Sequence, residues 1–162
     1  MGETATTDPR MSLFQRFWKL VGESGVWKAI GKVHAQLYRL TGGTLGHRAG
    51  GIRNLLLTTA GRKSGALRTV PLAYLEDGDD FVLVASNGGA DRHPAWWLNL
   101  AARPAATIQV GGQTLAVVAH RATPAEHARL WPRLKAVNPF YGVYEQITAR
   151  EIPVVILRPT GR

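Results

Sequence analysis

The sequence predicts an antiparallel β-barrel with helices packed against its outside. Three observations support this fold class: strand-like segments predominate after residue 50, short glycine-containing turns join several of them as hairpins, and the helical stretches are amphipathic. The 162 residues, of which 45% are hydrophobic and 19% charged, are enough to bury one core. We therefore expect a barrel domain over residues 41–162, preceded by a separate N-terminal region.

The predicted N-terminal region covers residues 1–40. Residues 1–10 are expected to be a disordered lead. Apolar residues recur at helical spacing from Ser12 to Gly22 and from Val26 to Leu40, with basic residues between them. Amphipathic helices of this kind lie on anionic membranes in some proteins and pack against the domain or a second subunit in others. Both interpretations stay open here.

Six strands are predicted in the barrel domain. They cover Ile52–Ala60, Leu67–Leu75, Phe81–Ala85, Ala105–Val110, Thr114–His120 and Ile152–Leu157. The glycine-bounded turn 61–65 joins the first two strands, and Gly111–Gly112 joins the fourth and fifth, as is typical of β-hairpins. Because hairpins make neighbouring strands antiparallel, the sheet is expected to be an antiparallel barrel.

Two helices are predicted between the strands. The first runs from Pro94 to Ala102 and stops at Arg103–Pro104, because proline cannot continue a helix. The second begins after Thr123, where T-P-A-E has the pattern of a capping box with proline at the first helical position, and it ends at Asn138–Pro139. Its inward face is expected to carry Leu130, Trp131, Leu134 and Val137.

The charge balance indicates an anionic partner. There are 20 lysines and arginines against 11 acidic residues, which gives a formal net charge of +9 and a sequence pI of about 10.7. Four of the acids crowd one predicted turn, E-D-G-D-D at 76–80, so the rest of the chain is more basic still. A phosphorylated or carboxylate-rich ligand, an acidic membrane face or a nucleic acid would suit this charge. The basic residues do not interleave with aromatics on one strand face as single-strand binders require, so we expect no nucleic-acid partner.

Several classes of site are excluded by the residues that are missing. The absence of cysteine excludes disulfides, thiol catalysis and thiolate metal sites. The five histidines lack metal-ligand spacing, so no metal is expected, and no phosphate-binding P-loop or Rossmann glycine motif occurs. No signal-peptide pattern is present at the N-terminus, and no apolar run approaches the ~18 residues that span a bilayer, so we expect a cytoplasmic protein.

The turn Gly61-Arg62-Lys63-Ser64-Gly65 is the first candidate site. A guanidinium fork, an ammonium and a hydroxyl in one bend are a plausible anion site. A solvated hairpin tip that happens to be basic is the alternative. The local sequence alone does not decide between them.

Two further segments carry side chains or backbone suited to chemistry. The loop Ser86-Asn87-Gly88-Gly89 follows a strand and precedes a helix, an arrangement that can present amide donors to a ligand, although such a loop is commonly only a turn. Phe140, Tyr141 and Tyr144 form an aromatic cluster directly after a helix. A tyrosine phenol can donate a hydrogen bond or a proton to a reduced substrate, or it can simply fill the mouth of the barrel.

Taken together, these segments resemble the deazaflavin-dependent nitroreductase family. The matching stretches are L-L-L-T-T-A-G-R-K-S-G-A-L-R-T-V-P-L (55–72), V-A-S-N-G-G-A-D-R-H-P-A-W-W-L-N-L (84–100), A-R-P-A-A-T-I-Q-V (102–110) and R-E-I-P-V-V-I-L (150–157). Members of the family are actinobacterial split β-barrel proteins that use cofactor F420, and many are described as F420-dependent quinone reductases. The combination is far more specific than any one motif.

The resemblance implies a role for each segment. The cofactor's phosphate and the start of its acidic glutamate tail would bind Arg62, Lys63 and Ser64. The deazaflavin ring would be lined by the backbone at Val70, Pro71, Val84, Ser86, Asn87, Gly88 and Gly89. The cofactor groove would be closed by Ala95, Trp96 and Asn99. The substrate, and with it catalysis, would involve Tyr141, Tyr144 and Ser86. One departure concerns Asn87, which stands where some members carry a lysine, so the path of the tail is in question.

The activity implied is hydride transfer from reduced F420 to a quinone, a nitroaromatic or an activated alkene, with the proton supplied by Tyr141, Tyr144 or water. Two alternatives stay open: a related barrel that binds FMN instead, and an F420-binding or membrane-peripheral protein without catalysis. The basic amphipathic segment 12–40 would suit a lipid-soluble acceptor such as menaquinone and contact with the inner face of the cell membrane. A homodimer is a further partner to consider, since split barrels often dimerise.

Overall fold

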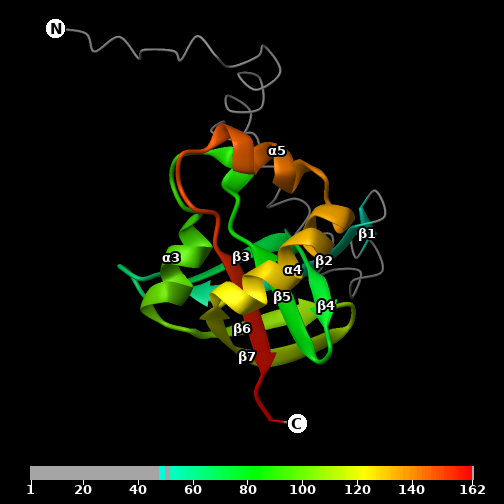
Figure 1. Ribbon diagram of the computed structural model, residues 1–162. Coiled ribbons are helices and arrows are strands. Elements are labelled where there is room, and N and C mark those ends of the chain that lie inside the picture. The colour runs from blue at the N-terminus through cyan, green and yellow to red at the C-terminus, as the bar shows by residue number, and fades with distance from the viewer. Residues whose placement is uncertain (1–47, 50–51, 162) are drawn as a thin grey trace, which may run out of the picture.

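The structure, a computed structural model, describes residues 48–49 and 52–161 (Figure 1). Within these residues the strands are β1 (Arg48–Ala49), β2 (Ile52–Ala60), β3 (Leu67–Ala73), β4 (Leu75–Asp77), β5 (Asp80–Val84), β6 (Ala105–Val110), β7 (Gln113–Arg121) and β8 (Val154–Pro159). The helices are the short 3₁₀ turn η1 (Asn87–Gly89), α3 (Ala95–Ala102), α4 (Pro124–Val137) and α5 (Phe140–Ile147). The predicted helices within residues 12–40, and the membrane contact proposed for them, lie outside the described residues.

The strands form one antiparallel sheet in the order β1-β2-β6-β7-β8-β5-β4, and β3 pairs with the other side of β2. Only Tyr74 separates β3 from β4. The same stretch of chain therefore pairs with β2 at one end, where Leu57 faces Val70, and with β5 at the other, where Leu75 faces Val82. This exchange of partners curls the sheet into a barrel that leaves few free edges. The prediction of an antiparallel split barrel is confirmed.

The predicted strand Leu67–Leu75 is thus divided in two. At Tyr74 the chain leaves β2, its amide donating to the carbonyl of Arg53 at 3.1 Å, and its side chain is 3% exposed in the core. Because the apolar alternation continues across the break, the sequence pattern could not reveal where the strand changes partner.

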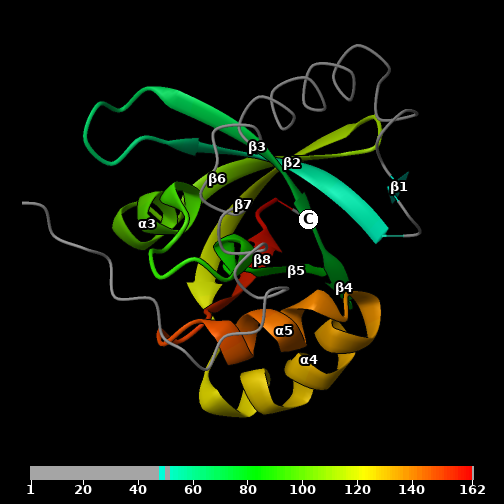
Figure 2. The same cartoon turned by 90° about the horizontal axis from the view of Figure 1, so that it is seen from above.

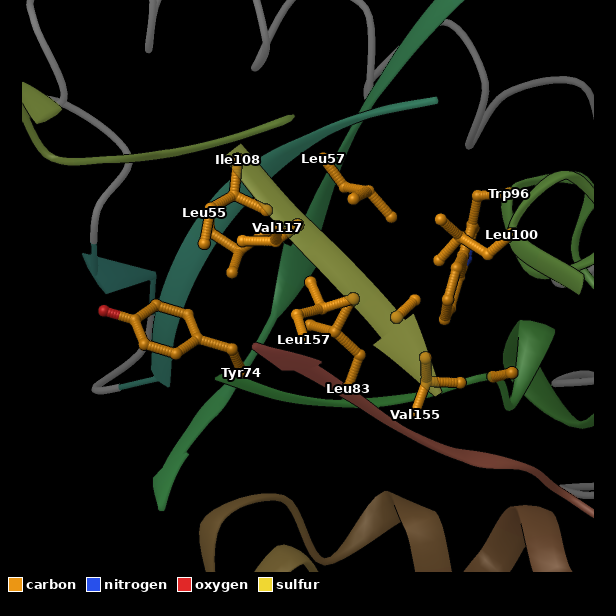
Figure 3. Close-up of a cluster of buried hydrophobic side chains, with 12 residues drawn as sticks. Leu55, Leu57, Tyr74, Leu83, Trp96, Leu100, Ile108, Val117, Val155 and Leu157 are labelled. Atoms are coloured by element: carbon orange, nitrogen blue, oxygen red, sulfur yellow. The ribbon is translucent and has the colours of Figure 1, made fainter. Parts of the chain in front are cut away.

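The interior of the barrel is filled by aliphatic side chains from the strands and by two residues of α3. Figure 3 shows Trp96 and Leu100 of α3 at one end of this cluster and Tyr74 at the other. Between them lie Leu55, Leu57, Leu83, Ile108, Val117, Val155 and Leu157. Burial of each large aliphatic side chain contributes roughly 1.5–3 kcal/mol, so this cluster holds α3 firmly on the barrel.

The other face of β5 and β8 is covered by α4 and α5, which lie together on one side of the barrel (Figure 2). Val82 and Val84 of β5 alternate with Leu83, which points into the barrel, as the period of two in a strand requires. The capping box at Thr123 and Glu126 starts α4 as predicted. Leu130, Trp131 and Leu134 face inward, but Val137 does not.

The expected inward position of Val137 is wrong: its side chain is 36% exposed. Val137 is the last residue of α4, where Asn138 and Pro139 turn the chain into α5. Helix α5 itself was not predicted. Its apolar residues have helical spacing, but it is only eight residues long and contains Gly142, which favours other conformations.

Candidate functional site

The turn between β2 and β3 is tight and rigid for its length. Gly65 has φ +70°, and its amide donates to the Gly61 carbonyl at 2.7 Å. A Cβ on Gly61 would stand 3.0 Å from Ser64 Oγ and 3.2 Å from the Ala66 carbonyl oxygen, so a side chain there would push these neighbours by a few tenths of an ångström. Arg62, Lys63 and Ser64 are exposed at its tip. Three polar side chains therefore extend into solvent from a fixed bend.

Asn99 of α3 fixes this turn to the helix. Its Oδ1 accepts from the amide of Arg62 at 3.1 Å, and its Nδ2 donates to Thr59 Oγ1 at 3.1 Å. Asn99 is 5% exposed and Thr59 is 2% exposed, so both bonds are sheltered from water. Asn99 thus positions the basic turn, because each polar atom of its amide group already binds a protein group.

Arg103, the residue at which α3 ends, adds a third cation beside the turn. Its Nη1 lies 3.9 Å from the place that a Cβ on Gly65 would occupy. Arg103 was predicted only as the residue at which the helix stops, and not as part of a site. Its single signal in the sequence is that it lies four residues after Asn99, one helical turn along.

The loop after β5 has an unusual backbone. Asn87, Gly88 and Gly89 have φ values of +51°, +64° and +79°, all in the left-handed region. Asparagine tolerates this region better than most residues with a side chain. The Asn87 side chain donates to the Arg92 carbonyl at 3.0 Å and so closes the loop on itself. This local role accounts physically for an asparagine where a lysine would be strained and would lose that bond.

Arg150, just before β8, holds the loop from its other side. Its guanidinium donates to four backbone carbonyls and meets one imidazole nitrogen: Ser86 O at 2.6 Å, Ala90 O at 2.8 Å, Ala85 O at 3.1 Å, Glu151 O at 3.2 Å and His93 Nδ1 at 3.2 Å. Burial, and next the charge of Arg150, lowers the pKa of His93, so its imidazole is neutral at pH 7 and its Nδ1 can accept a hydrogen bond from the guanidinium. Arg150 was not predicted as a site residue, because its partners in and beside the loop are 57–65 residues away along the chain.

Helix α5 packs directly on this loop. A Cβ on Gly89 would lie 2.5 Å from Ile147 Cδ1 and 3.3 Å from Tyr144 Cδ1, so only glycine allows this approach. Tyr144 is half-buried beside the loop. Tyr141 is 7% exposed and stacks on Trp131, with ring centroids 6.3 Å apart. The aromatic cluster and the glycine loop, 50 residues apart in sequence, thus meet in space.

The two tyrosines differ in environment. Burial raises the pKa of Tyr141 to about 12 and raises that of Tyr144 as well. Both phenols therefore keep their proton at neutral pH and can donate a hydrogen bond. Tyr144 is the one that touches the loop, whereas Tyr141 belongs to the core between α4 and the sheet.

Helix α3 connects the turn and the loop. The loop is followed by residues 90–94 and then by α3, in which Asn99 bonds the turn, and Arg103, just after the helix, lies beside the turn. At 1.5 Å per residue, α3 itself is about 12 Å long. In Figure 2 the turn projects beyond the barrel on the side of α3, and the loop runs between α3 and α5.

The other predicted groove residues occupy different layers. Val70 and Pro71 of β3 are half-buried, with Val70 packed against the barrel interior, while Val84 packs in the layer under α4 and α5. Ala95 is exposed at the start of α3. Trp96 is 7% exposed and lies in the barrel core, so its ring anchors α3. The side chains of Val70 and Val84 are therefore not brought together.

A cavity of about 500 Å³ lies apart from the turn 61–65 and the loop 86–89. It lies between α4, α5 and the segment before β8, and its lining contains none of the predicted site residues. Trp131, Ile152 and Val154 give it apolar walls, and Arg150 forms part of its wall toward the loop.

Among the described residues no group of three histidine, cysteine or acidic side chains is arranged to hold a metal ion. No helix in the described part of the chain combines the length and hydropathy needed to cross a membrane.

Comparison with known proteins gives a consistent result. The family described as F420H(2)-dependent quinone reductase matches residues 30–159. A Mycobacterium tuberculosis protein named F420H(2)-dependent quinone reductase is 42% identical over 130 residues, which are 78% of this chain and 87% of that protein. A solved structure of an F420-H2 dependent reductase is 36% identical, with a TM-score of 0.60 over 65% of this chain and 93% of the other. A second, described as a domain-swapped dimer, is 32% identical, with a TM-score of 0.63 over 78% and 96%.

Proposed function

Since the chain belongs to the F420H(2)-dependent quinone reductase family, we propose that the basic turn 61–65 and the loop 86–89, joined by α3, form its cofactor groove. The protein is an oxidoreductase, and its cofactor is coenzyme F420. The single observation that carries the groove is Asn99, which bonds the turn to the helix that follows the loop.

The groups present fit this cofactor. Its phosphate and glutamate carboxylates need cations, and Arg62, Lys63 and Arg103 are all exposed around one rigid turn. Its flat ring needs polar contacts along an edge, and the left-handed loop 87–89, on the N-terminal side of α3, offers backbone amides. The net charge of +9 suits the same polyanion. Binding of FMN as the cofactor has no comparable support, since FMN lacks the acidic tail that the cations of the turn would bind.

Reduced F420, when bound, supplies the hydride and its two electrons to the acceptor. The chain's part is to bind, orient and exclude water. Tyr144, half-buried against Gly89, keeps its phenol protonated and is placed to donate a hydrogen bond, or a proton, to the reduced acceptor. Tyr141, which is buried in the core, supports Tyr144. Ser86 lies at the start of the loop and is 8% exposed, and the bond from Arg150 to its carbonyl oxygen holds its backbone in place.

The acceptor that suits the family best is a quinone, and a lipid-soluble one such as menaquinone would place the protein at the inner face of the membrane through residues 12–40. Nitroaromatics and activated alkenes are further acceptors for the same chemistry. We also propose a homodimer, because one relative with 32% identity is described as a domain-swapped dimer.

The test is oxidation of reduced F420, followed spectroscopically, with menadione, a nitroimidazole and an unsaturated enone. We expect turnover with menadione above all. No oxidation above background with any acceptor would refute the reductase. Parallel titrations with F420 and FMN, read through tryptophan fluorescence, separate the cofactors: micromolar binding of FMN with no response to F420 would reverse the assignment.

A second experiment separates the two tyrosines. Tyr144→Phe is expected to lower kcat for quinone reduction at least about tenfold, within the usual range for loss of a general acid. Tyr141→Phe is expected to change kcat little and to act mainly on stability, since that ring is buried in the core. Equal kcat values for the two variants and the wild type would remove the phenol from the mechanism.

A further inference from the structure

The guanidinium of Arg150 gathers carbonyl oxygens from one short loop. Within the described residues its hydrogen-bond partners are four carbonyls and an imidazole nitrogen, and none is a carboxylate. Three of the carbonyls, those of Ala85, Ser86 and Ala90, belong to the loop between β5 and α3. An exposed arginine of β8, Arg158, pairs instead with the carboxylate of Asp80.

Peptide geometry gives this arrangement a consequence. In a planar trans peptide the C=O of one residue and the N–H of the next point in opposite directions. Because the carbonyls of Ala85, Ser86 and Ala90 point at Arg150, the amides of Ser86, Asn87 and Asp91 point away from it. One side chain therefore sets the direction of three donors in the loop.

We propose that Arg150 is a positioning residue, which aims these amides at the polar edge of the cofactor ring and adds positive charge behind them. This inference rests on the proposed groove. The hydrogen-bond partners of the Arg150 guanidinium include no described carboxylate, and the charge of Asp91 acts on it without such a bond, so the positive charge behind the loop favours electron-rich oxygens on its far side. The left-handed run 87–89, which has little conformational preference of its own, needs such an external tie.

The alternative is a purely structural role, in which Arg150 only ties the loop to β8. If Arg150 positions the amides, its removal lowers F420 affinity and a replacement guanidinium ion restores it. If Arg150 is only a structural tie, its removal lowers stability and leaves F420 affinity unchanged. Arg150 lines the cavity of about 500 Å³, so removing its side chain opens a path from that cavity to the loop carbonyls. A small guanidinium ion added to solution can then occupy the vacated position.

The experiment compares Arg150→Ala, Arg150→Lys and the control Arg158→Ala in the full-length protein. Affinity for F420 is read from tryptophan fluorescence, and thermal unfolding is recorded for each variant without ligand. We expect Arg150→Ala to weaken F420 binding about tenfold or more, because it removes a charged group with several hydrogen bonds. Arg150→Lys should recover only part of the lost affinity, because lysine lacks the planar fork of a guanidinium. Arg158→Ala should bind F420 like the wild type.

Chemical rescue decides between the roles. Millimolar methylguanidinium should restore most of the F420 affinity of Arg150→Ala, whereas methylammonium should not. Lowered thermal stability with unchanged F420 affinity in either Arg150 variant would refute the proposal and leave a structural tie. If Arg150→Ala does not fold, Arg150→Lys with unchanged F420 affinity is the refuting result.

A parallel Arg62→Ala variant separates failure of this inference from failure of the groove. Loss of F420 affinity in Arg62→Ala but not in the Arg150 variants overturns only the role of Arg150. Unchanged affinity in all of them overturns the groove itself.

Discussion

Replacing Gly89 by alanine tests the contact between the loop and α5. Gly89 has φ +79°, where a residue with a Cβ costs about 1–2 kcal/mol. The added Cβ would also lie 2.5 Å and 2.7 Å from Ile147 Cδ1 and Cγ1. Overpacking of this kind costs about 1–3 kcal/mol, so Gly89→Ala should destabilise the protein by about 2–5 kcal/mol in total.

Gly78 provides the matched control. Its φ is +65°, but a Cβ there would meet nothing within 4 Å. Gly78→Ala should therefore cost only the backbone contribution, about 1–2 kcal/mol. The difference between the two variants measures the clash with α5 and not the left-handed backbone.

The assay is urea unfolding of the wild type and both variants, with the slope of the transition checked for a two-state fit. A third variant, Gly89→Ala combined with Ile147→Val, removes the nearest methyl and should recover about 1 kcal/mol relative to additivity. Equal costs for Gly89→Ala and Gly78→Ala would refute the packing of α5 on the loop, and so would a coupling energy near zero.

Three further predictions follow from other contacts. Arg62→Ala and Lys63→Ala should each weaken F420 binding about fivefold to tenfold at low salt and less at high salt, whereas Arg158→Ala should not. Two arginines of α4 hold the pKa of Asp77 well below its usual range. Its contribution to stability is therefore complete above the unfolded pKa of about 3.9 and is lost as pH falls through the lower pKa of the folded state. Asp77→Asn should lower stability at pH 7 by on the order of 1–2 kcal/mol and flatten acid unfolding, and an unchanged acid transition would contradict this. Thr123→Ala should cost about 1 kcal/mol in urea unfolding by removing the cap of α4.

Features that depend on neighbours in sequence were predictable. Both hairpins, the capping box at Thr123 and the end of α4 at Asn138 are set by local backbone preferences and short-range bonds, and the structure has them. The turn 61–65 could be identified as a candidate site because its cations are adjacent. Its attachment to Asn99, 37 residues later, was not predicted, because the family resemblance implied only that Asn99 closes the cofactor groove.

Features that depend on distant partners were missed for a physical reason. Arg150 bonds backbone carbonyl oxygens, and every residue carries one, so no residue type in the loop marks it as a partner. The acidic run at 76–80 was predicted only as a turn, yet Asp77 pairs with Arg129 and Arg133, which follow more than 50 residues later. Such ion pairs are set by the packing of α4 on the sheet and leave no periodic signal.

Hydrogen–deuterium exchange of the full-length protein with and without F420 tests the central claim most directly. The account predicts that F420 protects the turn 61–66 and the loop 86–91 together, while the exposed turn at Gly78–Asp79 exchanges unchanged. Protection confined to the walls of the cavity between α4 and α5, with the turn and the loop unaffected, would contradict a cofactor groove along α3.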